Sequence, residues 1–148
     1  MRFISHKAEE TRALGQKLTR NFLKKRSPRK ALIISCEGEL GTGKTTFIQG
    51  VARGFGIKEQ IKSPTFVILR QHRLPQEVAG FETFYHLDCY RLKGARDILN
   101  LGFKDLICDP KNVIVIEWAN RIKKCLPAES LRVKFRHLGN QKREIRIK

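Results

Sequence analysis

Residues 38–46 read Gly38-Glu39-Leu40-Gly41-Thr42-Gly43-Lys44-Thr45-Thr46. This stretch matches the pattern G-x-x-x-x-G-K-S/T at every required position, which is the P-loop signature of nucleotide-phosphate binding. The glycines let the backbone curl so that successive N–H groups point at phosphate oxygens. We expect Lys44 to reach the β- and γ-phosphates and the Thr45 hydroxyl to bind the Mg²⁺ that bridges them.

Both flanks of this motif have the patterns that a P-loop requires. Residues 31–36 form a nearly continuous apolar run, which is typical of a buried parallel strand. Beyond the motif, apolar residues recur at helical spacing from Phe47 to Phe55, and Gly56 provides a stop. The sequence therefore predicts a strand, a loop and a helix that begins near Lys44. The positive end of this helix dipole would face the phosphates.

The length indicates one domain, residues 1–148, and the cysteine pattern indicates a reducing compartment. A chain of 148 residues buries about two-thirds of its unfolded surface without added staples. The four cysteines are too far apart to indicate a zinc site or a redox dithiol, so free thiols in a reducing cytoplasm are expected. No signal peptide and no apolar run of membrane-spanning length is apparent, which predicts a cytoplasmic protein without membrane contact.

The net charge of +17 is concentrated at the two ends of the chain. Residues 1–35 and residues 121–148 each contain ten Lys and Arg against two Glu, whereas residues 36–120 are almost balanced. Two basic ends suit RNA or an acidic protein partner. They are equally compatible with a solvated basic face, and charge alone leaves these alternatives open.

The remaining segments predict further strands and helices around this centre. Residues 2–4 are expected to form a short strand, followed by a helix to about Lys24 with Ser5 as its N-cap. Thr65 should open a strand over 65–69, and a turn containing Pro75 and Gly80 should lead into a return strand over 84–90. A short helix over 97–101 follows, and residues 131–136 and 143–147 predict a closing hairpin with one apolar and one basic face.

Two carboxylates lie at positions where a nucleotide site needs them. Residues 113–118 form a second buried strand, which reaches Glu117 near its end. In P-loop proteins an acid at this point holds Mg²⁺ through a bound water and orients the attacking water. Asp88 lies within an apolar strand, where it is costly unless it is paired with Mg²⁺-bound water, Lys44 or Arg91. A purely structural pair with Arg91 is the alternative, and a lone histidine such as His86 is more often a packing residue than a catalyst.

Several motifs together resemble the TsaE (YjeE) family, the bacterial ATPases of tRNA threonylcarbamoyladenosine biosynthesis. These motifs are Glu10-Thr11, the stretch 38–47, Ser63-Pro64-Thr65-Phe66, the H-x-D-x-Y-R-L pattern of 86–92, and Ile116-Glu117-Trp118. The resemblance implies an α/β fold of the P-loop NTPase type, a three-layer sandwich whose central parallel sheet is flanked by antiparallel strands.

The resemblance also implies a function. It implies that the chain binds ATP and Mg²⁺ and acts with TsaB and TsaD partner proteins. ATP hydrolysis would let that complex turn over while it attaches threonylcarbamoyl to the adenosine beside the anticodon. Contact with tRNA through the basic ends is not part of the family pattern and is inferred from charge.

The resemblance assigns roles to individual residues. Lys44, Asp88 and Glu117 would be catalytic, and Thr45 with Glu117 would hold the metal ion. Trp118 would lie close enough to report nucleotide binding by its fluorescence. The nucleotide would contact Thr11, Glu39, Leu40, Gly41, Thr42, Gly43, Lys44, Thr45, Thr46 and Thr65.

Two other functions remain open from the sequence. A small-molecule P-loop kinase would need a lid, and its candidate is residues 70–80, which are predicted to be a hairpin loop. A basic RNA-binding module with a vestigial nucleotide site would retain RNA affinity when Lys44 is replaced.

Overall fold

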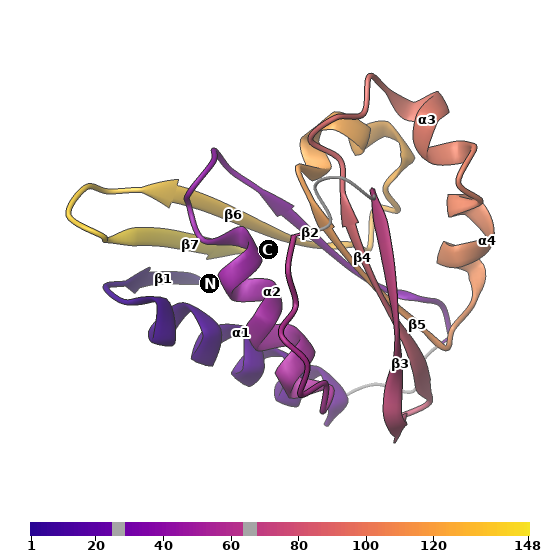
Figure 1. Cartoon of the computed structure of the whole chain (residues 1–148), viewed down its shortest axis with the longest axis horizontal. Helices are drawn as coiled ribbons and strands as arrows, with labels where there is room; N and C mark the ends of the chain where they lie inside the picture. Colours follow the sequence, from indigo (N-terminus) through magenta and orange to yellow (C-terminus); the bar gives the residue numbers. More distant parts are fainter. Residues whose placement is uncertain (25–28, 64–67) are drawn as a thin grey trace.

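The computed structural model describes residues 1–24, 29–63 and 68–148. It contains a seven-stranded mixed sheet with helical segments on both faces (Figure 1). The elements are β1 Arg2–Ser5, α1 Ala8–Leu23, β2 Leu32–Glu37, α2 Lys44–Gly54, β3 Leu69–Val78, β4 Phe81–Asp88, α3 Ala95–Leu99, α4 Phe103–Cys108, β5 Asn112–Glu117, the 3₁₀ segment η1 Ala119–Cys125, β6 Leu131–His137 and β7 Arg143–Ile147.

The sheet has a parallel centre and antiparallel edges. Its strand order is β1-β7-β6-β2-β5-β4-β3. β2 pairs in parallel with β5 and with β6, and β4 pairs in parallel with β5. β1, β7 and β6 are antiparallel at one edge, and β3 is antiparallel to β4 at the other. This arrangement confirms the predicted fold class, and it brings the carboxyl ends of β2, β4 and β5 to the same edge of the sheet.

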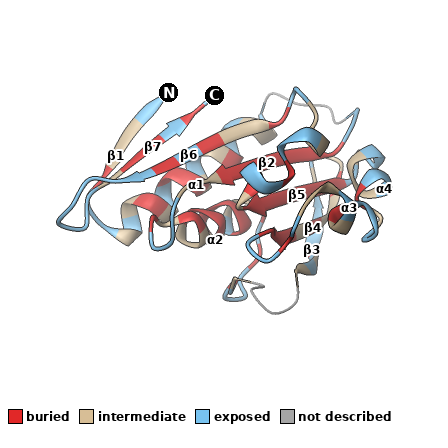
Figure 2. Cartoon of the chain, turned by 90° about the horizontal axis from the view of Figure 1, so that it is seen from above, coloured by how far each residue is buried: buried red, intermediate tan, exposed pale blue. Residues whose placement is uncertain are grey.

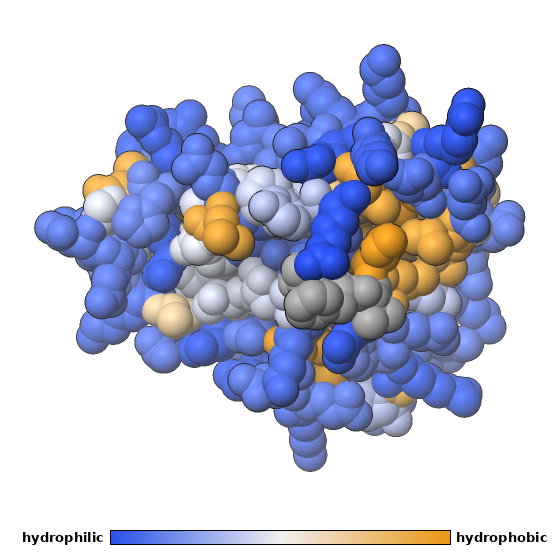
Figure 3. Space-filling model, turned by 45° about the horizontal axis from the view of Figure 1, so that its top comes forward, coloured by the Kyte–Doolittle hydropathy of each residue, from blue (hydrophilic) through white to orange (hydrophobic). Residues whose placement is uncertain are grey.

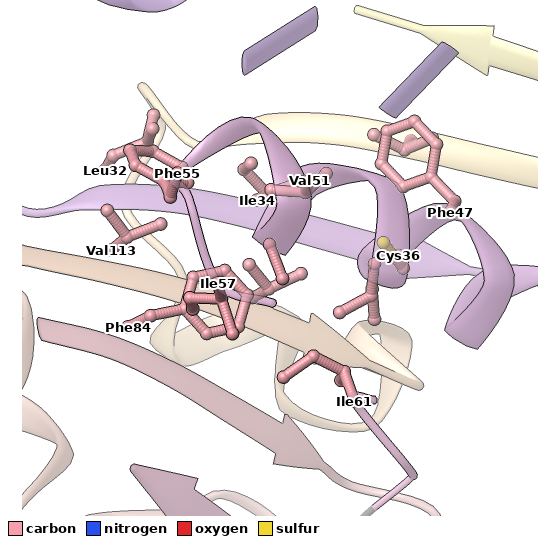
Figure 4. Close-up of a cluster of buried hydrophobic side chains, with 14 of the residues drawn as sticks. Leu32, Ile34, Cys36, Phe47, Val51, Phe55, Ile57, Ile61, Phe84 and Val113 are labelled. Carbon is pink, nitrogen blue, oxygen red and sulfur yellow. The ribbon is translucent and has the colours of Figure 1, made fainter. Parts of the chain in front are cut away.

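Alternating side chains of the central strands build two apolar layers. In β2, Leu32 and Ile34 point into the cluster beneath α1 and α2, whereas Ile33 belongs to the cluster on the opposite face. That second cluster includes Ile98 of α3 and Phe103 of α4. Figure 2 shows the central strands as a continuous buried band, and Figure 4 shows β2 and α2 side chains meeting in the first cluster. The sheet is therefore the middle layer of three.

Two glycines let α1 pack directly on the backbone of α2. A Cβ atom added at Gly50 would lie 2.0 Å from the carbonyl oxygen of Arg12, and one added at Gly15 would lie 2.4 Å from that of Phe47. Thr19 extends the same contact, since its hydroxyl donates to the carbonyl of Val51 at 3.2 Å. α1 thereby fixes the position of the helix that begins at the P-loop.

The predicted start of α1 is wrong in its capping residue. Lys7 is the N-cap residue, in extended conformation and without a side-chain cap. Ser5 belongs to β1, and its hydroxyl shares a hydrogen bond of 2.7 Å with the hydroxyl of Thr11. The Glu10 carboxylate instead accepts a hydrogen bond from the backbone N–H of His6. Ser5 therefore tethers strand to helix instead of capping the helix.

The stretch predicted as a loop over 70–80 is mostly strand. β3 continues to Val78, and the chain turns at Ala79 and Gly80. Pro75 is accommodated because β3 is an edge strand whose pairing with β4 shifts between Arg73 and Val78. Residues 65–67 of the expected strand lie outside the described part of the chain. Across the described residues, no helix has the length and apolar character needed to cross a membrane.

Candidate nucleotide site

The P-loop joins the end of β2 to the start of α2. Gly43, at φ +94°, is the N-cap of α2, and its carbonyl accepts the N–H of Phe47 at 2.9 Å to close the first helical turn. This positive φ suits glycine because a side chain would be strained there. The helix begins at Lys44, as the motif predicts, so its free N–H groups and positive dipole end face the loop.

Lys44 is held inward at the base of the loop. Its Nζ donates to the carbonyl oxygens of Gly38 and Glu39, both at 2.8 Å. The same atom lies 4.1 Å from the centre of the Trp118 ring, a cation–π contact. Burial lowers the pKa of the Lys44 ammonium below its usual value, although the nearby Glu117 carboxylate opposes that shift. An anion in the loop would offset this loss of hydration.

Trp118 adopts a backbone conformation that is uncommon for a non-glycine residue. Its φ of 57° places it in the left-handed region, directly after β5. Such a conformation costs on the order of 1–3 kcal/mol and persists where its surroundings require it. The Tyr90 ring packs 4.9 Å from the Trp118 ring. The turn therefore directs an indole over Lys44, beside Glu117.

Glu117 connects the P-loop helix to β4. The Thr45 hydroxyl lies 2.9 and 3.0 Å from the two oxygens of its carboxylate. On the other side, His86 Nε2 lies 2.9 Å from Glu117 Oε1, and His86 is fully buried. The His86 Nδ1 atom is buried without a hydrogen-bond partner in the described residues. His86 thus orients Glu117 toward Thr45.

Asp88 lies beside Glu117 because β4 and β5 are parallel and place these residues opposite each other. Its carboxylate accepts the Ser63 hydroxyl at 2.7 Å and the backbone N–H of Tyr90 at 2.9 Å. These two donors offset the cost of a buried acid. The two acids at the ends of adjacent strands therefore face the same opening.

These residues surround one pocket of about 270 Å³. Its lining consists of Leu40, Gly41, Gly43, Lys44, Thr45, Thr46, Ser63, Asp88, Tyr90, Glu117, Trp118 and Arg143. Most of the residues singled out from the sequence are thus brought together. The loop backbone and α2 form one wall, and the ends of β4 and β5 form another.

Other predicted contact residues lie around the pocket or beyond the described chain. Glu39 has an exposed side chain and contributes its carbonyl to Lys44 and to the Thr42 hydroxyl. Thr11 is fully buried beneath Gly43, where its hydroxyl meets Ser5. Thr65 lies outside the described residues. Each of these assignments stays a prediction.

Arg143 is the pocket residue that sequence reasoning missed. It begins β7, and its Cδ would lie 3.0 Å from a Cβ built on Gly43. Its Nη1 donates to the Gln141 carbonyl at 3.3 Å, while its buried Nε has no partner among the described residues. The sequence does contain one indication of this position. Residues 143–147 alternate with period two, so Arg143 lies on the same inward face as Ile145 and Ile147.

The donor set fits a phosphate chain and a magnesium ion. The loop offers backbone N–H groups, the Lys44 ammonium and the unpaired Arg143 Nε to phosphate oxygens. Thr45 and Glu117 offer adjacent oxygens to a hard cation. In the described part of the chain no three His, Cys, Asp or Glu side chains are grouped to hold a metal ion. Mg²⁺ accords with this, because it is bound through one or two carboxylates together with substrate phosphates.

Comparisons with known proteins show which family the chain belongs to. The chain is 36% identical over 137 residues to the tRNA threonylcarbamoyladenosine biosynthesis protein TsaE of Bacillus subtilis, covering 93% of this chain and 78% of that protein. It is 34% identical over 147 residues to the protein of the same name from Treponema pallidum, covering 99% of each. A crystal structure of Bacillus subtilis YdiB superposes with a TM-score of 0.75 at 30% identity, over 98% of this chain and 82% of that one. Residues 5–145 match the family described as threonylcarbamoyl adenosine biosynthesis protein TsaE, and the chain therefore belongs to the TsaE family.

Proposed function

We propose that this protein is an ATPase that serves the modification of tRNA to threonylcarbamoyladenosine in the cytoplasm. One observation carries the proposal: Lys44, Thr45, Asp88 and Glu117 come from three separate elements and line one pocket at the P-loop. The relatives' names supply the process, since they are tRNA threonylcarbamoyladenosine biosynthesis proteins.

The geometry supports a division of labour among these residues. On ATP binding, Lys44 would exchange its two carbonyl acceptors for phosphate oxygens, and the α2 N-terminus would face the same charge. Thr45 and Glu117 would hold Mg²⁺, which supplies charge neutralisation on the phosphates when bound. Arg143, across from Gly43, would add a charge-assisted hydrogen bond to the nucleotide.

The two acids differ in their surroundings, which favours different roles. Glu117 already accepts from Thr45 and lies against His86, so its orientation is fixed. Asp88 faces the same opening and accepts from Ser63, a hydroxyl that lines the pocket. Asp88 is the better placed of the two to accept a proton from the water that would attack the γ-phosphate, while Glu117 would hold the metal ion.

The partners in this proposal are proteins of the TsaB and TsaD type. Slow hydrolysis by the isolated chain and stimulation by the partner complex are expected, because full catalysis in many P-loop proteins needs a group supplied in trans. The rival kinase function loses its candidate lid, since residues 70–78 belong to strand β3.

Reconstitution over several catalytic cycles tests the proposal. Threonylcarbamoyl transfer to tRNA by a TsaB–TsaD complex should continue past the first cycle only when this protein and ATP are present. Lys44→Ala should stop after the first cycle, whereas Lys58→Ala, an exposed lysine away from the pocket, should behave as wild type. Equal turnover with and without the protein would refute the proposed role.

A further inference from the structure

The face of β1, β7 and β6 that lies opposite α1 and α2 is strongly basic and is not covered by any of the described helices. α1 and α2 cover one side of β1, β6 and β7, and α3 and α4 lie at the other end of the sheet (Figure 1). The view from above shows β1, β7 and β6 without a helix over their opposite side (Figure 2). We name this surface the basic sheet face and define it by the six cations Arg2, Arg132, Lys134, Arg136, Arg146 and Lys148.

Strand alternation places these side chains on one face. In β6, Val133 and Phe135 point into the core beneath α1 and α2, so Arg132, Lys134 and Arg136 point the opposite way. In β7 and β1, Ile145, Ile147 and Phe3 also pack on that core. The alternate residues Arg146, Lys148 and Arg2 therefore point to the opposite face.

The strand register arranges the cations in rows across the sheet. Arg146 of β7 stands opposite both Arg2 of β1 and Lys134 of β6, which makes a row of three. A second row joins Arg132 to Lys148, which exchange two backbone hydrogen bonds of 2.9 Å. Neighbouring strands are about 4.8 Å apart, and alternate residues along a strand about 7 Å. Spacings of this size suit successive phosphates of a nucleic-acid backbone.

Two carboxylates interrupt the basic sheet face without neutralising it. Glu144 is buried and pairs with Arg2 and Arg146, and Glu37 lies 3.6 Å from Lys134. The side chains of Arg2, Lys134 and Arg146 nevertheless keep 66%, 63% and 55% of their surface exposed. The carboxylates orient the cations, and the positive charge remains accessible.

The composition of the face distinguishes an RNA partner from a protein partner. Ile4 of β1, which stands opposite Glu144, is an apolar side chain on this face, and cations surround it, so the face offers little of the apolar centre that a stable protein interface buries. The aromatic residues Phe3 and Phe135 point into the core and are not available to stack on unpaired bases. Figure 3 shows a surface that is mostly hydrophilic, with apolar side chains gathered mainly toward the right of the view. The cations of the face are therefore the groups available for binding, and their natural ligands on RNA are the backbone phosphates.

We propose that the basic sheet face binds the phosphate backbone of a folded, double-helical RNA without reading its sequence. The inference deepens the proposed function, on which it rests for the choice of tRNA as that RNA. The face lies opposite the helical layer, and Glu37, beside Lys134, immediately precedes the P-loop residue Gly38. RNA bound there would approach the nucleotide site from β6 and β2.

A charge-matched pair of variants tests the inference. One variant combines Arg132→Ala, Lys134→Ala and Arg136→Ala on the face. The control removes three exposed cations around α3 and α4 with Lys93→Ala, Arg96→Ala and Lys104→Ala. The probe is a fluorescein-labelled tRNA transcript, and its dissociation constant is measured by anisotropy without nucleotide from about 50 to 200 mM salt.

The face variant should bind tRNA about 10-fold or more weakly than wild type, and its log–log salt dependence should be less steep by about 2. The control variant should stay within about 2-fold of wild type. Equal weakening in both variants would overturn the inference, because general charge would then explain the binding. Displacement of tRNA by polyglutamate at equal charge concentration would overturn it as well, in favour of an acidic protein partner.

ATP hydrolysis measured on the same samples separates this inference from the proposed function. The face variant should hydrolyse ATP as wild type does, and Lys44→Ala should bind tRNA as wild type does. A face variant that loses thermal stability reports on folding, and the single exposed change Arg136→Glu then decides the test. Arg136→Glu should weaken tRNA binding in a stable protein, and unchanged tRNA binding by stable Arg136→Glu would overturn the inference.

Discussion

At the scale of single residues, the site depends on side chains that are positioned before any ligand arrives. Glu117 accepts from Thr45 and touches His86, while Lys44 is held by two carbonyls and an aromatic ring. Preorganised groups of this kind lose little freedom on binding, so more of their interaction appears as affinity or rate.

Arg143 gives the residue-scale prediction. Arg143→Ala should raise the dissociation constant for ATP about 10-fold or more, because a charge-assisted hydrogen bond to a phosphate is lost. Isothermal titration calorimetry measures the change. Arg136→Ala, on the opposite face of the same hairpin, is the matched control and should leave ATP affinity unchanged. Equal affinity in wild type and Arg143→Ala would remove Arg143 from the nucleotide site.

At the scale of elements, the α1–α2 contact keeps the P-loop helix in place. A methyl group at Gly50 would meet the Arg12 carbonyl at 2.0 Å. The clash should outweigh the ~1 kcal/mol gain in helix propensity that Ala has over Gly. We expect Gly50→Ala to lower the free energy of unfolding by about 2 kcal/mol.

Denaturant unfolding of Gly50→Ala measures this effect, and the loss of ATP affinity reports the displaced loop. Asn21→Ala places the same side chain at an exposed position of α1 and should change stability by less than about 0.5 kcal/mol. A Gly50→Ala protein as stable as wild type would show that the helices separate easily.

The pairing of β1 with β7 includes pH-dependent ion pairs of Glu144 with Arg2 and Arg146. Hydrogen bonds from Arg146 and Arg2 lower the pKa of its carboxyl below the usual 4.5. A carboxyl whose pKa is lower in the folded than in the unfolded protein stabilises the folded protein at pH values above its unfolded-state pKa. This stabilisation is lost as the pH falls through the folded-state pKa. Glu144→Gln should therefore be less stable than wild type at pH 7.

The stability deficit of Glu144→Gln should shrink as the pH falls below 4.5 and through the lowered pKa of the folded protein, where the wild-type carboxyl binds its proton. Denaturant unfolding at pH 7 and at a series of pH values below 4.5 measures this change. A deficit that stays the same across this series would mean that the glutamine disturbs packing and that charge plays no part.

At the scale of the whole molecule, local patterns predicted the centre of the fold well. The run at 31–36, the glycines and Lys44 have one consistent local structure, so β2, the P-loop and α2 appear where the pattern places them. The closing hairpin was predictable from its period of two, and the structure confirms it. The errors occurred where contacts between neighbouring elements decide the local structure. Ser5 of β1 is engaged by Thr11 of α1, and the shifted pairing of β3 with β4 accommodates Pro75 within a strand.

The site was predictable as far as its motifs extend. The acids of β4 and β5 could be proposed because each follows an apolar strand, and the parallel register then places Asp88 opposite Glu117. Arg143 belongs to no nucleotide-binding motif. It reaches the pocket because β7 lies two strands from β2, a neighbourhood that only the sheet order reveals.

We propose above all that the pocket at the P-loop binds ATP and Mg²⁺ and that Glu117 supports hydrolysis from the neighbouring strand. The most direct measurement compares wild type with Glu117→Gln in Mg²⁺-dependent phosphate release, with Trp118 fluorescence following ATP binding in the same samples. We predict that ATP still changes the fluorescence of Glu117→Gln while hydrolysis falls about 100-fold or more. Hydrolysis by Glu117→Gln at the wild-type rate would contradict the account.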